Sequence, residues 1–139
     1  MADVRSTTDT TMRIAASGLR AQQSRMRIIA ENMANANSTS RTPGGDPYRR
    51  QVAVFQPQAV DGGQGVRMSR VEADRRDFKT TYDPGHPAAD ENGYVKMPNV
   101  DPLIEALDLR EAQRAYEANL NVIETARSME MRTLELLKK

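Results

Sequence analysis

The chain has 139 residues and a net charge of +1, because 20 Lys and Arg residues oppose 19 Asp and Glu residues. This is the length of one average domain, and the near-neutral charge excludes a dedicated nucleic-acid-binding module. Only 38% of the residues are apolar and 4% aromatic, so we expect much of the burial to come from partner proteins. The absence of cysteine excludes disulfides, thiolate metal sites and thiol nucleophiles.

Residues 9–35 are predicted to form a long amphipathic helix. Asp9 or a nearby Thr would cap its start, and the Asn, Ser and Thr run of residues 35–40 would end it. Two apolar lines follow a helical spacing, which predicts contact with more than one neighbour. The first line comprises Met12, Ala16, Leu19, Met26, Ala30 and Met33, interrupted by Gln23; the second comprises Ile14, Ala21 and Ile28, with Ala15 and Ile29 between the two lines.

The middle of the chain, residues 41–99, is predicted to be β structure and loops. It holds all but one of the 7 prolines and all but one of the 8 glycines, and the helical period disappears there. Residues 48–56 and 65–73 are β-prone, and the turn-rich residues 57–64 between them predict a hairpin. Residues 82–93 combine prolines, glycines and acids, which favours an ordered surface loop without regular structure.

A second long helix is predicted to begin after Asp101, an N-cap residue followed by Pro102. No Gly or Pro follows, so the helix is expected to reach the last residues. Two apolar lines run along it, which suits burial on two sides. One line comprises Ala112, Ala115, Val122, Ala126, Met129 and Leu136; the other comprises Tyr116, Leu120, Ile123, Leu134 and Leu137, and the breaks are Asn119, Arg127, Glu130 and Thr133.

No residue pattern supports catalysis or a bound cofactor. His86, with Asp83 and Asp90 nearby, is the one candidate for acid–base or metal chemistry, but a metal site needs about three or four ligands, so we interpret it as a loop histidine. The glycines of the DGGQG segment lack a following P-loop Lys and are interpreted as turn residues. Ser17 and Ser24 have no histidine base nearby in the sequence. We therefore expect no enzyme, no metal and no cofactor.

Two features indicate packing instead. The arginine pairs Arg49–Arg50 and Arg75–Arg76 are interleaved with acids, which favours solvated strand ends or ion pairs between subunits. Gly18 lies inside a helix, where glycine costs roughly 1 kcal/mol relative to alanine. A close approach by a neighbouring helix would offset that cost.

Several segments resemble bacterial flagellar rod and hook proteins. The N-terminal segments SGLRAQ (residues 17–22), RM (25–26) and IAENMANANST (29–39) are similar to the signature in which a long helix of that family ends in an Asn-rich turn. Three further segments resemble the proximal-rod members: GGDPYRR (44–50), YDPGHPAADENGYV (82–95) and EAQRAYEANL (111–120). Met33 and Ser38 depart conservatively from the family pattern, which has Ile and Thr more often at these positions.

This resemblance implies a mainly α fold with a small β and loop insertion. The long terminal helices, in residues 1–36 and 101–139, would pack as a coiled-coil-like pair and form one rod-core domain, and residues 37–100 would supply a β-hairpin and an extended loop. The implied function is a structural subunit of the proximal rod of the flagellar basal body, in the periplasm, that transmits torque. Export through the flagellar type III apparatus would need no cleaved signal peptide, and the polar N-terminus indicates none.

The implied partners are other copies of the chain and other rod proteins: FlgB and FlgF of the proximal rod, FlgG of the distal rod and the adaptor FliE. No nucleic acid or small-molecule substrate is implied. A helical adaptor that binds one partner through a helical hairpin is the alternative. The expected subunit-interface residues are Met12, Ala16, Gly18, Leu19, Met26, Ile29, Met33, Tyr116, Leu120, Ile123, Met129 and Leu136; the expected helix-exit residues are Asn32, Asn35 and Asn37; and the expected middle-region contacts are Tyr48, Arg49, Arg50, Asp83, Pro84, His86 and Tyr94.

Overall fold

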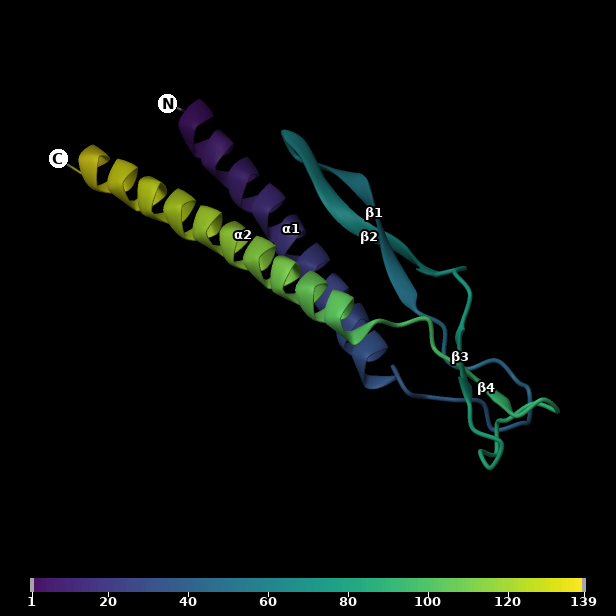
Figure 1. The fold of residues 1–139 in the computed structure, drawn as a ribbon. Helices are drawn as coiled ribbons and strands as arrows, with labels where there is room; N and C mark the ends of the chain where they lie inside the picture. Colours follow the sequence, from purple (N-terminus) through teal and green to yellow (C-terminus); the bar gives the residue numbers. More distant parts are fainter. Residues whose placement is uncertain (1, 139) are drawn as a thin grey trace. The chain divides into compact units, whose positions relative to one another are not determined.

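A computed structural model describes residues 2–138. The chain begins and ends with a long helix, and the four strands come between the helices in the sequence. The order is α1 (Ala2–Ala34), β1 (Gln51–Val60), β2 (Gly63–Ala73), β3 (Lys79–Tyr82), β4 (Tyr94–Met97) and α2 (Pro102–Leu137) (Figure 1). The predicted class, mainly α with a small β insertion, is confirmed. None of the described helices is long and apolar enough to cross a membrane.

The chain forms two compact units, and both helices run through both units. The first unit contains the chain up to Met26, the hairpin residues Val54–Arg70, and the chain from Arg110 onward. The second contains Arg27–Ala53 and Val71–Leu109.

Helix α1 begins earlier than predicted. It already includes Ala2, so Asp9 is not its cap; Asp9 instead forms an ion pair with Arg13, one turn later, at 3.1 Å. The hairpin contacts the part of α1 that was predicted: the Thr10 hydroxyl donates to the Asp61 carbonyl oxygen at 3.0 Å, and Arg13 pairs with the Asp61 carboxylate at 3.0 Å.

The predicted end of α1 and the predicted start of α2 are confirmed. Helix α1 ends at Ala34, where the Asn35 side chain donates back to the Glu31 carbonyl oxygen at 2.9 Å. At the start of α2, the Asp101 carboxylate accepts a hydrogen bond from the Leu103 amide at 3.0 Å. Asp101 therefore caps the helix as its position before Pro102 predicts.

The middle region contains two β-hairpins rather than one. β1 and β2 pair as predicted, but both strands extend into the expected turn, which shrinks to Asp61 and Gly62, with Gly62 at a φ of 88°. The second hairpin was not predicted: β3 and β4 are antiparallel, with Tyr82 opposite Tyr94, and they close the 83–93 loop at its base. Strands of four residues are too short to leave a pattern in the sequence.

In the first unit, α1 and α2 run antiparallel. Gly18 faces Asn119, and Arg25 approaches Glu111 at 3.7 Å, so advancing along α1 means going back along α2. A Cβ atom at Gly18 would lie 2.9 Å from Asn119 Nδ2. The side chain of Asn119 on α2 therefore occupies the space over Gly18.

The hairpin packs on another face of α1 in the same unit. The Ser17 hydroxyl donates to the Ile14 carbonyl oxygen at 2.7 Å and accepts from the Val66 amide at 3.1 Å. Gly65 permits this approach, since a Cβ there would lie 2.3 Å from Ser17 Oγ. Ser17 is thus a buried packing residue that joins helix and hairpin.

The buried residues of α1 do not follow the first apolar line. Ala15, Ala21, Ile28 and Ile29 are buried. Most of the first apolar line, by contrast, is half-buried or exposed. On α2 the least exposed positions also repeat with spacings of three and four, and they include three of the expected breaks; these positions are Glu105, Leu109, Ala112, Tyr116, Asn119, Ile123, Ala126, Glu130 and Thr133.

Gly18→Leu is expected to destabilise the protein by about 1–3 kcal/mol, because the larger side chain would overpack the contact with Asn119. Chemical denaturation followed by circular dichroism measures the change. Ala30→Leu is the matched control at an exposed position on the same helix, where no loss of stability is expected. Equal stability of Gly18→Leu and the wild type would contradict close packing at Gly18.

Candidate subunit-interface site

The second unit contains a polar network at the start of β1, which fixes the residues expected to make contacts. Asn32, in the last turns of α1, is buried at 1% exposure. Its side-chain oxygen accepts from the Tyr48 hydroxyl at 2.8 Å and from the Gln51 amide at 2.9 Å, while its Nδ2 donates to the Gln51 carbonyl oxygen at 2.8 Å. The Asn32 side chain therefore binds both the amide and the carbonyl oxygen of Gln51, as the backbone of a neighbouring strand would.

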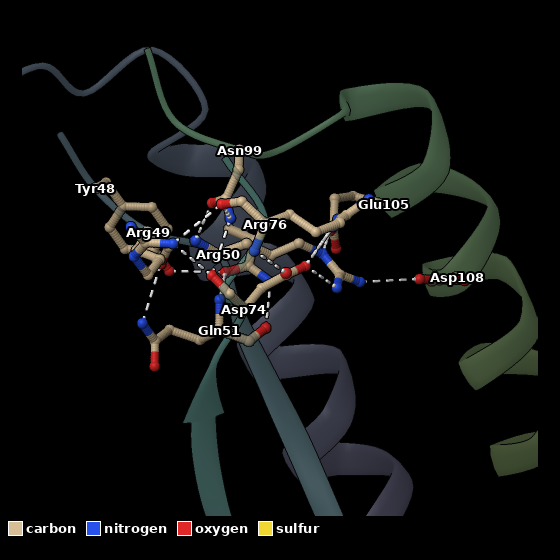
Figure 2. Close-up of polar contacts among 10 residues, drawn as sticks. Tyr48, Arg49, Arg50, Gln51, Asp74, Arg76, Asn99, Glu105 and Asp108 are labelled. Atoms are coloured by element: carbon tan, nitrogen blue, oxygen red, sulfur yellow. Dashed lines mark hydrogen bonds and ion pairs between the residues drawn. The ribbon is translucent and has the colours of Figure 1, made fainter. Parts of the chain in front are cut away.

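Arg50 lies next to this contact and forms three ion pairs. Its Nε donates to Glu105, its Nη1 lies 3.2 Å from Asp74, and its Nη2 lies 3.5 Å from Asp108 (Figure 2). The Glu105 side chain is fully buried, and its Oε2 has no hydrogen-bond partner among the described residues. A buried carboxylate without a cation would be strongly destabilising, so Arg50 is required to keep the start of α2 in place.

Asn99 completes the network from the segment before α2. Its side-chain oxygen accepts from the Arg50 amide at 2.7 Å, and its Nδ2 donates to the carbonyl oxygens of Asp74 and Arg76 at 3.0 and 3.1 Å. Asn99 therefore joins the end of β2 to the start of β1. Sequence analysis missed this residue because nothing in its local pattern distinguishes it from a turn asparagine.

Charge and burial shift several pKa values in this network. The hydrogen bond from Arg76, with further contributions from its backbone and from Arg50, holds the pKa of Asp74 at about 2 despite burial. Burial lowers the pKa of Arg50, but the hydrogen bond and charge of Glu105 outweigh it and raise the pKa above its usual value. Burial and nearby negative charge raise the pKa of Tyr48. The ionised forms of Arg50 and Asp74 are thus stabilised by each other's presence.

The network brings together three of the expected middle-region contacts: Tyr48, Arg49 and Arg50. Arg49 donates to the Asp74 carbonyl oxygen at 2.8 Å and stacks over the Phe78 ring at 4.1 Å. These side chains are engaged within the chain, so Arg50 does not have the solvated position that was one of the two roles its spacing favoured.

The other expected contacts lie in the loop between β3 and β4 and, for Tyr94, at the start of β4. Tyr94 packs its ring edge-on against Tyr82, with ring centroids 5.3 Å apart, and both rings are exposed. His86 Nδ1 accepts a hydrogen bond from the Ala88 amide at 3.0 Å, which is the local loop role proposed for it. The described residues contain no group of three His, Cys, Asp or Glu residues placed to hold a metal ion. Asp83 and Pro84 begin the same loop.

The three asparagines expected at the helix exit have different environments. Asn32 lies inside α1 and is buried, as described above. Asn35 lies in the turn, where its side-chain oxygen accepts from the Ser38 hydroxyl at 3.0 Å. Asn37 is exposed in the same turn. Only the last two are turn residues.

The expected helical interface residues remain partly uncovered in the isolated chain. Met129 is 55% exposed and Leu136 is 75% exposed, and Leu120 and Met33 are exposed as well. Met12, Ala16, Leu19, Met26, Tyr116 and Ile123 are half-buried. Ile29 is the exception, since it is buried within the chain. A chain with this much apolar helix surface uncovered is built for packing against other proteins.

Comparisons with known proteins agree with this interpretation. The model of the flagella basal body rod protein family matches residues 12–41, and the model of the flagellar basal body rod FlgEFG protein C-terminal region matches residues 91–136. The first match covers α1 from Met12 onward and the turn after it, and the second covers β4 and nearly all of α2. They define the class as a flagellar rod protein.

Curated relatives extend the match over nearly the whole chain. The flagellar basal-body rod protein FlgC of Agrobacterium fabrum is 52% identical over 91% of this chain and 92% of its own length. FlgC of Salmonella typhimurium is 45% identical over 88% and 92%, and FlgC of Bacillus subtilis is 35% identical over 91% and 96%. The chain belongs to the FlgC family of flagellar basal-body rod proteins, and its function is that of a structural rod subunit in the flagellar basal body.

Asn32→Ala is expected to destabilise the protein by about 2–4 kcal/mol, because it leaves the Tyr48 hydroxyl and both backbone groups of Gln51 without their partner. Chemical denaturation measures the loss. Asn37→Ala, in the exposed turn, is the control and should change stability little. If the two variants were equally stable, the pairing of Asn32 with Gln51 would not matter for the fold.

Stability should fall as pH drops from about 4 to about 2, because Asp74 has a pKa of about 2 in the folded protein and 3.8 ordinarily. A lowered folded-state pKa contributes stability above the ordinary value, and that contribution disappears as the carboxylate is protonated. Urea unfolding at several pH values tests this: Asp74→Asn should flatten the acid side of the profile. Arg76→Gln removes the main cause of the lowered pKa, so the folded-state pKa should rise toward 3.8 and the loss of stability in acid should become smaller. An unchanged profile in both variants would refute the role of Asp74.

Proposed function

We propose that this chain is a non-enzymatic subunit of the proximal rod that polymerises helically with other rod proteins, crosses the periplasm and transmits torque to the hook. The observation that carries this proposal is the uncovered apolar surface of α1 and α2 in a chain whose relatives are structural rod proteins. When one surface of a subunit binds a different surface of the next subunit, head to tail, the contacts generate an open helical assembly.

The proposed rod core consists of residues 1–36 and 101–139 acting as one domain, and residues 37–100 reach other subunits. The spacing of three and four residues between the least exposed positions of α2 supports coiled-coil-like packing of the two helices. Small residues at the contact, such as Gly18, Ala112 and Ala126, allow the close approach. Many helix contacts of this kind, acting together along the rod, would resist torque.

The proposed contacts with neighbours use the exposed and half-buried members of the predicted set. Leu120, Met129 and Leu136 expose apolar surface that water disfavours, so their burial would drive assembly. Ile29 and Gly18 lie against the chain's own elements, and we assign them the role of holding α1 in place. Asp83, Pro84 and His86, in the loop between β3 and β4, and Tyr94, at the start of β4, are proposed to reach neighbouring subunits.

The proposed partners are further copies of the chain, the rod proteins FlgB, FlgF and FlgG, and the adaptor FliE. Export through the flagellar type III apparatus without a cleaved signal peptide is part of the proposal. A helical adaptor would instead form a discrete complex with one partner, and rod relatives over most of the chain argue against it.

Leu120→Asp tests the proposal in a strain that lacks the native gene. A carboxylate in a buried helix contact is strongly unfavourable, so we expect loss of the rod in isolated basal bodies viewed by electron microscopy, and loss of swimming. Ser128→Asp, at an exposed polar position on the same helix, should assemble normally. Restoration of rods by Leu120→Asp would contradict the packing role. Intact rods in the uncomplemented deletion strain would contradict the rod function itself.

A further inference from the structure

The loop that joins β3 to β4 contains the pair Asn92–Gly93, and Asn92 is the only asparagine of the chain that is followed by glycine. Asn92 is exposed; its backbone amide is hydrogen-bonded, but its side chain makes no hydrogen bond to any described residue. Asn32 and Asn99, by contrast, are buried, and their side chains are hydrogen-bonded. The Asn92 carboxamide is therefore open to solvent and to the backbone that follows it.

The hairpin requires glycine at the position after Asn92. Gly93 has a φ of 85°, a backbone conformation that other residues rarely adopt, and a Cβ atom there would lie 2.9 Å from Tyr82 Cε2. Because glycine has no side chain, its backbone nitrogen is also the least shielded. The fold thus places after Asn92 the residue that least hinders an attack by the backbone nitrogen on the Asn92 carboxamide.

Asp90 closes the turn around this pair. The Gly93 amide donates to the Asp90 carbonyl oxygen at 3.0 Å, and the amides of Asn92 and Tyr94 both donate to Asp90 Oδ1 at 2.9 Å. The Gly93 carbonyl oxygen in turn accepts from the Asp83 amide at 2.9 Å, at the base of the loop. The Gly93 nitrogen attacks only after it loses its proton, and in the closed turn that proton is held in the hydrogen bond to Asp90.

We propose that Asn92 is a deamidation site and that the turn closed by Asp90 protects it in the folded chain. In the reaction, the Gly93 nitrogen loses its proton and forms a bond to Asn92 Cγ, the Cγ–Nδ2 bond breaks, and the departing nitrogen leaves as ammonia. Water then opens the resulting cyclic imide at either of its two carbonyl carbons. The products are aspartate and isoaspartate at position 92, and each event consumes one water and releases one ammonia.

The products do not fit the closed turn. Opening of the imide at its backbone carbonyl carbon routes the main chain through the former side chain of Asn92 and lengthens it before Gly93. The amides after this point then no longer match the two oxygens of Asp90. Either product also adds a carboxylate beside Asp90 and Glu91, where like charges repel. The site belongs to the loop alone and is independent of the proposed contacts between subunits.

Mass spectrometry of the purified full-length chain tests the site. Trypsin cleaves after Lys79 and Lys96, so residues 80–96 form one peptide in which Asn92 is the only asparagine. In mildly alkaline buffer, replacement of NH2 by OH in this peptide should be at least about tenfold faster with guanidinium chloride than without it, because only the open turn reacts. Residues 28–41 form the control peptide, whose three asparagines should react much more slowly in denaturant. Equal rates with and without denaturant, or a reaction at Asn92 no faster than in the control peptide, would overturn the proposal.

Variants at Asp90 test the protection. Asp90→Ala removes the oxygen that holds the Asn92 and Tyr94 amides, so the reaction at Asn92 in the folded chain should become several-fold faster. Asp90→Asn keeps an acceptor oxygen and should react at nearly the wild-type rate. Asp83→Ala is the matched control, because the Asp83 carboxylate lies in the same loop and makes no hydrogen bond to a described residue. If Asp90→Ala is folded by circular dichroism and reacts as slowly as the wild type, Asp90 does not protect the site.

Hydrogen exchange gives a second measurement that needs no variant and so holds even if Asp90→Ala fails to fold. Denaturant below the unfolding midpoint should raise the exchange rate of the Gly93 amide and the deamidation rate of Asn92 in the same proportion, because both need the turn to open. Rates that change independently of each other would overturn the protection by the turn.

Discussion

The buried ion pair between Arg50 and Glu105 is the interaction on which the second unit depends. Glu105 is completely buried at the start of α2, and its charge is compensated only because β1 presents Arg50 to it. Asp74 and Asn99 fix Arg50 in turn, from the end of β2 and the segment before α2. Through its guanidinium and its backbone amide, Arg50 thereby joins the end of β2, the segment before α2 and the start of α2. A buried pair of this kind contributes less to net stability than to the choice of one arrangement, because desolvation offsets much of its attraction.

The first unit is held together by apolar contacts instead of a buried ion pair. Small residues lie between its helices, and large apolar residues lie on its surface. Ala15, Ala21, Ala112 and Ala126 are buried, whereas Met129, Leu136 and Leu137 are exposed. A protein stable on its own would bury its largest apolar side chains first. The reversed arrangement suits a subunit whose burial is completed by neighbours, in agreement with its membership of a rod protein family.

Several residues of the candidate site were predicted from the sequence, but the contacts that they make were not. Tyr48, Arg49 and Arg50 were identified from their place in a family segment. Yet the partners of the two arginines, Asp74, Asn99 and Glu105, are 24 to 55 residues away in the chain, and the Tyr48 hydroxyl donates to Asn32, 16 residues earlier. No local pattern reports such distant pairing. Asn32 was identified as a turn residue, but its side chain is buried and pairs with Gln51, which only the path of the chain after α1 could reveal.

The sequence by itself determined the two long helices, the cap at Asp101, the end of α1 and the first hairpin, because these depend on short-range spacing and on residues with strong local preferences. It did not determine which helix faces are covered. The apolar lines through Leu19 and Leu120 have the same period as the lines that become buried, and periodicity identifies an apolar face without identifying its partner. Only the tertiary structure decided that Gly18 and Asn119 form the contact and that the larger residues beside them stay uncovered. Small side chains allow the closest helix approach, so the helices pack there.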